Sequence, residues 1–166
     1  MHTLERLQRA WGSKLYPPTS VSERDLSDLE AELQFGFPKG YRAQVLEFGL
    51  PGPTAELWDW LTDREDAAIA RYGFTLAMLF KSSPPHLNDF FTPEEMQEAL
   101  SSRELGLPEH LLPFANDSSG NLFCFDLTVL RASPGANSSV YYWDHDFLEV
   151  ERLAKTFDRF VNLYLP

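Results

Sequence analysis

The sequence is short of cysteine, of long apolar runs and of positive charge. Its 166 residues contain a single cysteine, Cys124, so no disulfide can form within the chain and a reducing compartment is expected. No stretch approaches the roughly 18 consecutive apolar residues that a membrane-spanning helix requires. The opening segment, MHTLERLQRAWGSKLY, lacks the apolar run and the small cleavage-site residues of a secretory signal peptide. These shortages together predict a cytoplasmic protein.

Positive charge is scarce, because 14 Lys and Arg residues stand against 25 Asp and Glu residues, for a net charge of −11. Proteins that bind nucleic acids neutralise phosphates with Lys and Arg, so no nucleic-acid partner is expected. An anionic membrane surface is disfavoured for the same reason. We expect a protein partner with a basic face instead, because opposite charges accelerate the encounter of two surfaces.

The polar segment that begins at Asp117, DSSGN, fails three templates for ligand or catalytic loops. A calcium loop that starts at Asp117 would need glycine at its sixth position, where Leu122 stands. Neither Ser118 nor Ser119 has glycine two residues away on both sides, as a nucleophile elbow requires. Gly120 stands alone, without the further glycines of a phosphate-binding loop. Asp, Asn and Gly are common in tight turns, so the segment favours a chain reversal over a ligand loop.

Cys124 lies in NLFCFDL, a segment whose aromatic residues predict a strand. Strand alternation places Leu122 and Asp126 on the face of Cys124. Phe123 and Phe125 then lie on the opposite face. No base or cation nearby in the sequence could activate the thiol, so a packed structural cysteine is favoured.

Helices are predicted along the first hundred residues. Apolar side chains in residues 4–11 recur at spacings of three and four, which is typical of a helix with one buried face. Ser22 followed by Asp25 resembles a capping box and predicts the start of a second helix. Pro38 suits the first turn of a third helix.

The middle of the chain is harder to interpret. Residues 62–72 are predicted as a helix capped by Thr62, and Thr92 followed by Pro93 predicts the start of another. Three segments have no helix prediction: AELWDWL and FTLAMLFK, which both stay ambiguous between helix and strand, and SSPPHLNDFF, which is predicted as a loop.

From residue 111 onward, short aromatic and branched runs are separated by Gly, Ser, Asn and Pro. LLPFA, NLFCFDL and SVYYWDHD are predicted as three strands of an antiparallel sheet. Residues 147–165 are predicted as one C-terminal helix, with Val150, Leu153 and Phe157 on its apolar face. Helices first, strands later and a covering helix last indicate an α+β fold in a single domain, residues 1–166.

Two further clusters are candidates for function. Asp144, His145 and Asp146 could ligate a metal or place a base beside a carboxylate, but successive strand residues point to opposite faces. A hydrolase or metal enzyme would use Asp117, Asp144 and His145. HExxH and CxxC motifs are absent, so strand-end structure is favoured, then a partner-facing patch, with metal or catalysis last. Trp58 and Trp60 flank Asp59 as an exposed aromatic patch, or one of them belongs to the core; both alternatives stay open.

Three blocks of sequence, in this order, resemble the SUKH superfamily of Smi/Knr-type immunity and regulatory proteins. LEAELQFGFPKGYRAQVLEFG, residues 29–49, is similar to the family's helix, short link and Pro-x-x-Tyr-Arg helix, although no Asn precedes Gly49. LLPFANDSSGNLFCFDL resembles its strand, acidic glycine turn and aromatic strand, and SVYYWDHDF its Val-Tyr-x-Trp-Asp-His strand. Residues 51–108 match poorly.

The resemblance implies a single SUKH-like α+β domain, with a mixed or mostly antiparallel sheet flanked by N-terminal helices and a C-terminal helix. It implies a non-enzymatic binding protein without a cofactor or metal, most often an immunity protein that neutralises a bacterial polymorphic toxin, frequently a nuclease. The alternative is an intracellular regulatory or scaffold adaptor of the same fold. The residues expected to contact the partner are Asp117, Asn121, Asp126, Trp143, Asp144, His145 and Asp146, with Asp59 and Trp60 as further candidates.

Overall fold

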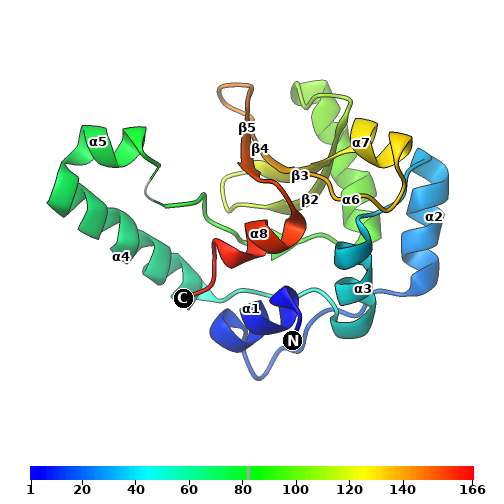
Figure 1. Ribbon diagram of the computed structural model, residues 1–166, viewed down its shortest axis with the longest axis horizontal. Coiled ribbons are helices and arrows are strands. Elements are labelled where there is room, and N and C mark those ends of the chain that lie inside the picture. Colours follow the sequence, from blue (N-terminus) through cyan, green and yellow to red (C-terminus); the bar gives the residue numbers. More distant parts are fainter. Residues whose placement is uncertain (82) are drawn as a thin grey trace.

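The computed structural model describes residues 1–81 and 83–166, which form helices around a five-stranded antiparallel sheet (Figure 1). The strands follow each other in space as in sequence: β1 (Asp89–Phe90), β2 (Leu111–Asn116), β3 (Leu122–Asp126), β4 (Val140–Asp144) and β5 (Glu149–Ala154). The helices are α1 (Thr3–Trp11), α2 (Glu23–Leu33), α3 (Lys39–Phe48), α4 (Ala55–Tyr72), α5 (Phe74–Leu79), α6 (Pro93–Ala99), the 3₁₀ helix η1 (Leu100–Leu105), α7 (Leu127–Ala132) and α8 (Phe157–Asn162). The predicted α+β fold is confirmed.

The larger core lies on one face of the sheet, where aromatic side chains of β2 and β3 meet α3 and α8. Phe114 and Phe125 stack with ring centroids 4.3 Å apart, and Tyr41 on α3 lies 4.9 Å from Phe157. The opposite face of β3 contributes Cys124 to a smaller buried cluster, as strand alternation predicts. Burial raises the pKa of the Cys124 thiol, so the residue is structural.

Local capping signals placed two helices correctly. Ser22 accepts the backbone N–H of Asp25 while the Asp25 carboxylate accepts the N–H of Ser22, so a capping box starts α2. Thr92 and Glu95 make the same reciprocal pair at the start of α6. Each box pairs two backbone N–H groups that have no partner within the helix.

The predicted C-terminal helix is wrong over its first half, because residues 149–154 form strand β5 beside β4. The side chain of Asp144 accepts the N–H groups of Asp146 and Phe147 at 2.9 and 3.1 Å, which closes a tight turn after β4. After this turn the chain runs back alongside β4, whose second edge is open to pairing. The hydrogen bonds that residues 149–154 form with β4 outweigh the helix propensity of the segment. Helix α8 starts only after Thr156, whose hydroxyl accepts the N–H of Arg159.

Three further predictions are corrected in detail. Helix α4 starts at Ala55 rather than after Thr62, so AELWDWL is helical, and the first six residues of FTLAMLFK form α5. Within the predicted loop 82–91, residue 82 lies outside the described residues, while Asp89–Phe90 form β1. The prediction that NLFCFDL is all strand is wrong at Leu127, which begins α7.

Helices α4 and α5 project away from the sheet on one side of the molecule, at the left of Figure 1. Helices α2, α3 and α6 lie on the other side, at the right of that view. Among the described residues, none of the helices combines the length and the apolar character that crossing a membrane requires.

Candidate functional site

The turn between β2 and β3 is built around the carboxylate of Asp117. Its Oδ1 accepts the backbone N–H groups of Ser119 and Asn121 at 2.8 and 2.9 Å. Its Oδ2 accepts the Asn121 side-chain amide at 2.9 Å and the Tyr142 hydroxyl at 2.8 Å. Gly120 turns the chain with a φ of 89°, a conformation that favours glycine. Both carboxylate oxygens are thus used inside the protein.

Asn121 links this turn to the end of β4. Its amide nitrogen also donates to the Tyr142 hydroxyl at 2.8 Å. Its Oδ1 accepts the backbone N–H of His145 at 3.1 Å and lies 2.7 Å from the His145 ring Nδ1. Burial, followed by the hydrogen bond to Asp117, raises the pKa of the Tyr142 phenol, which therefore stays protonated. We call Asp117, Asn121, Tyr142 and His145 the turn network.

Asp117 and Asn121, which were both expected to contact a partner, point into the protein. Both are only 8 % exposed, and their polar atoms bond within the turn network. His145 is half-buried against the same turn, and its Nε2 lies 3.3 Å from the exposed carboxylate of Asp146. The network therefore holds two strand ends together, and Asp146, which lies outside it, is exposed.

The other residues expected at the partner surface also have structural contacts. Trp143 is 1 % exposed in the smaller buried cluster, together with Cys124. Asp126 caps α7 by accepting the N–H of Thr128 at 2.8 Å. Asp144 closes the β4–β5 turn as described above. Of Asp144, His145 and Asp146, only the last two have side chains close together, at 3.3 Å. Both carboxylate oxygens of Asp117 accept hydrogen bonds from the same chain.

Of the two outlying candidates, Asp59 is exposed on α4 and Trp60 is half-buried. Trp60 packs against Trp11 with ring centroids 5.1 Å apart, and the Arg64 guanidinium lies 4.6 Å above its ring. Trp58, by contrast, is 47 % exposed. One tryptophan of the pair thus belongs to the packing between α1 and α4, and the other faces outward.

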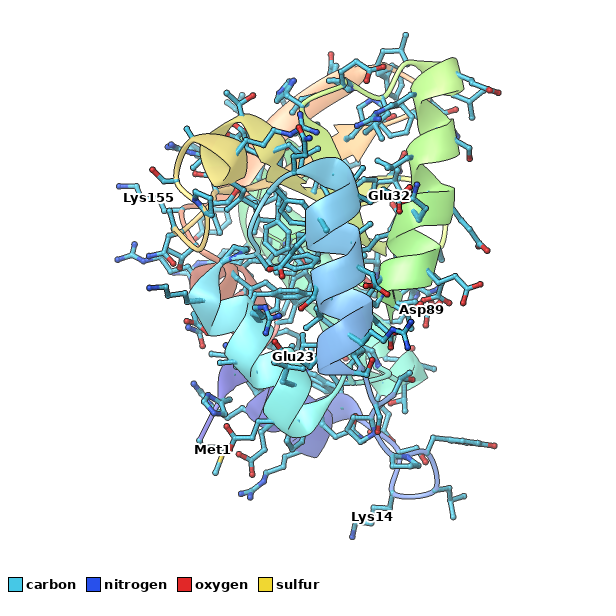
Figure 2. All side chains as sticks on the ribbon, turned by 90° about the vertical axis from the view of Figure 1, so that its right-hand side faces the viewer. Met1, Lys14, Glu23, Glu32, Asp89 and Lys155 are labelled. Carbon is cyan, nitrogen blue, oxygen red and sulfur yellow. The ribbon has the colours of Figure 1, made fainter. Side chains whose placement is uncertain are left out.

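A different surface carries unpaired charge: the adjacent faces of α2 and α6. Two neighbouring grooves of about 560 Å³ each lie there, and both are lined by Thr92 and Glu98. Figure 2 views this side, with Glu32 between α2 and α6 and Asp89 near the start of α6. The exposed carboxylates that line the grooves, which we call the acidic face, are Asp25, Asp28, Glu32, Asp89, Glu94, Glu95 and Glu98.

The charges of the acidic face are poorly neutralised. Neither groove is lined by Lys, Arg or His among the described residues. The single ion pair found there within the described residues joins Asp28 to Arg24 at 3.6 Å, on an exposed helix surface where such pairs contribute little. Glu32 accepts only the neutral amide of Gln97, at 3.1 Å. A negative potential therefore builds up over the two grooves.

The opposite side of α2 shows how the fold treats acidic residues that it does neutralise. Arg42 on α3 bonds Glu23 at 2.6 Å and Glu30 at 3.3 Å. The hydrogen bond from Arg42 holds the pKa of the Glu23 carboxyl below its usual range. Helix α2 thus has one acidic side paired with α3 and one acidic side left for solvent or a partner.

Sequence reasoning missed the acidic face, although each helix was predicted. Asp25, Asp28 and Glu32 follow a helical spacing on α2, as Glu94 and Glu98 do on α6. These spacings could have identified two acidic helix faces. Their apposition depends on the packing of α2 against α6, which no local pattern reveals.

No group of three or more His, Cys, Asp or Glu side chains in the described part of the chain is arranged to hold a metal ion. Residues 20–163 match the sequence model of the SMI1/KNR4 family (SUKH-1), and a comparison with curated proteins finds no match. The matched region includes the residues of the turn network and of the acidic face.

Proposed function

The chain belongs to the SMI1/KNR4 family (SUKH-1), and from this membership we propose that it is a non-enzymatic binding protein that neutralises a bacterial toxin. The family includes toxin immunity proteins and is generally non-catalytic. We assign no catalytic, cofactor or metal residue to the chain. The partner is a toxin with a basic surface, and a nuclease meets that description because its substrate is polyanionic.

The acidic face is the observation that carries the proposal. Its seven exposed carboxylates surround two adjoining grooves that no cation lines among the described residues. A nuclease gathers Lys and Arg where it holds phosphates, and a negative surface of matching extent competes for the same cations. Binding there covers the substrate site, so neutralisation needs no chemistry from the inhibitor.

The charge arrangement also suits rapid capture. A net charge of −11 attracts a basic partner over distances of about a Debye length, roughly 8 Å at physiological salt. An immunity protein must bind its toxin before the toxin reaches its target, so a fast association rate is useful. Complementary charge raises association rates more than it raises the affinity of a formed complex.

The test uses two variants with matched charge. The site variant carries Glu32→Lys, Glu94→Lys and Glu98→Lys, and the control variant carries Asp63→Lys, Asp66→Lys and Glu104→Lys. All six residues are exposed, and each variant changes the net charge by +6, from −11 to −5. Only the site variant alters the acidic face.

The protein encoded by the neighbouring gene serves as the candidate toxin, in co-purification and in rescue of cells that express it. We expect the site variant to bind at least about 100-fold more weakly than the control variant and to lose rescue. Equal binding by both variants contradicts the assignment of the acidic face. A wild-type chain that binds a non-toxic partner and rescues no cells supports the adaptor alternative instead.

A further inference from the structure

Strand β5 is an edge of the sheet, and no described segment pairs with its outer side. It pairs only with β4, and no other backbone hydrogen bond reaches Glu149–Ala154 from any described segment. An edge strand presents a row of free N–H and C=O groups, to which another extended chain can add. At six residues β5 is long enough to hold such an addition.

A groove of about 680 Å³ runs along this edge, between β5 and the projecting helices α4 and α5. Glu151, Arg152 and Leu153 all line it. The pairing with β4 is regular from Glu149 to Arg152 and shifts by one residue at Leu153. Glu151 and Arg152 therefore point to opposite faces of the sheet, and a groove that both residues line follows the edge of the strand.

The side of the groove that faces β5 contains prolines. It includes Pro84 and Pro85, which lie in the segment that leads from α5 to β1. Proline has no N–H to donate, so at these two successive positions the segment lacks a donor for pairing with β5. The hydroxyl of Tyr164 donates to the Pro85 carbonyl at 2.7 Å and holds the segment in place. Met78 of α5 and Leu163 add apolar lining.

A second copy of this chain is a poor occupant of the edge. In a continuous antiparallel sheet, directly opposed residues share a face, so a two-fold pairing of β5 with itself must centre on one residue. Centred on Val150, it opposes Glu149 to Glu151 of the copy. Centred on Glu151 or on Arg152, it opposes that residue to its own copy. These three registers centre on the part of β5 that pairs regularly with β4, before the irregularity at Leu153, and each places like charges opposite each other, which is destabilising.

We propose that the β5 edge binds an extended segment of the protein partner as a sixth, antiparallel strand. The segment carries a cation opposite Glu149, an acidic residue opposite Arg152 and an apolar residue opposite Leu153. The exposed side chain of Glu149 has no ion pair among the described residues, and neither does Arg152. Glu151 already pairs with Lys81 across the groove.

This inference rests on the proposed function only for the identity of the protein that supplies the sixth strand. Its test therefore needs no toxin. The probe is the synthetic hexapeptide TLEKVK. In antiparallel order its first residue lies opposite Ala154 and its last residue lies opposite Glu149. Amide NMR shifts and hydrogen exchange of the full-length protein report its binding. We expect saturable shifts at β5 and at the groove lining, with slower exchange of the β5 amides.

Two N-methylated forms of the peptide give the decisive comparison, one modified at the odd positions and one at the even positions. Alternate N–H groups of a strand point to opposite sides, so only one set can bond to β5. We expect one form to bind at least tenfold more weakly and the other to bind like the parent. The charge-swapped peptide TLKEVE should also bind at least tenfold more weakly.

Equal behaviour of the two N-methylated forms overturns the proposal, as does an absence of shifts at β5. Protection of the β5 amides in a dimer without peptide overturns it too, in favour of a second copy. If the peptide binds as expected while toxin rescue fails, the proposed function falls and the strand site stands. If toxin rescue succeeds while the peptide does not bind, the strand site falls and the proposed function stands.

Discussion

The turn network and the acidic face are both rich in polar side chains, yet they differ in burial and in hydrogen bonding. In the turn network, Asp117 and Asn121 are buried and bonded to groups of the same chain. On the acidic face, Glu94 and Glu98 are exposed and have no cation beside them among the described residues. A polar cluster that satisfies itself holds the fold together, whereas one that leaves its charge unpaired is available to a partner.

The largest effect is expected from breaking the turn network. Asp117→Ala leaves the backbone N–H groups of Ser119 and Asn121, the Asn121 amide and the Tyr142 hydroxyl without their acceptor. We expect a loss of about 3 kcal/mol in the free energy of unfolding, measured by denaturant titration. The exposed neighbour Asp146 provides the control, since Asp146→Ala should change it by less than about 0.5 kcal/mol. A similar small change for Asp117→Ala would show that the network is dispensable.

Alkaline pH should weaken the fold next most strongly. Burial raises the pKa of the Tyr41 and Tyr164 phenols, and burial with the Asp117 bond raises that of Tyr142. In the unfolded chain the phenols ionise near pH 10. The contribution that the protonated phenols make to the free energy of unfolding is therefore complete below about pH 10, and it is lost as pH rises toward the folded-state pKa values. The loss for each fully buried phenol is about 1.4 kcal/mol per pH unit.

Unfolding monitored between about pH 9 and pH 11 checks this slope. Tyr142→Phe should give a shallower decline, because one phenol with a raised pKa is removed. The site variant at the acidic face should follow the wild-type curve, since no phenol lines either groove. A steeper decline for Tyr142→Phe would contradict the sign of the effect.

Salt should act on the acidic face and spare the turn network. Raising ionic strength from about 0.05 M to about 0.5 M shortens the range of exposed charges, so affinity for the toxin should fall about tenfold. The midpoint of urea unfolding should stay nearly constant, because the bonds of the turn network are internal. Calorimetric binding at several salt concentrations measures the first quantity. Salt-independent binding would argue for an apolar interface.

The smallest effect is expected from the cap of α6, which carries part of the acidic face. Thr92→Ala removes the acceptor of the Glu95 N–H and should cost about 1 kcal/mol of folding free energy. Ser118, exposed in the β2–β3 turn, is a suitable control. Toxin affinity should fall only slightly, because the carboxylates remain. Thermal unfolding and binding of the two alanine variants provide the comparison.

Much of the fold was predictable because its signals are local. The capping boxes at Ser22 and Thr92 involve residues three apart, and alternation around Cys124 needs only the strand itself. Residues 149–154 were predicted as helix because Val150 and Leu153 fall on one apolar face of a helix that continues to Phe157. Pairing with β4 decided the outcome, and that pairing is not visible in the segment.

The candidate site was less predictable for a related reason. DSSGN was correctly interpreted as a turn, yet the inward direction of Asp117 depends on Tyr142, which lies 25 residues further along the chain. The acidic residues of α2 and α6 were visible as charges, but neither helix alone indicates that the two lie side by side. The acidic face is therefore visible only in the tertiary structure.

Residue patterns alone established the family blocks, the net charge of −11, the capped helices and the alternation of the central strands. Each of these depends on residues close together in the chain or on a simple count. Tertiary structure decided which polar side chains are satisfied and which are not. A hydrogen bond or ion pair depends on the partner that folding brings near, so Asp117 became part of the fold while Glu94 and Glu98 stayed free to bind.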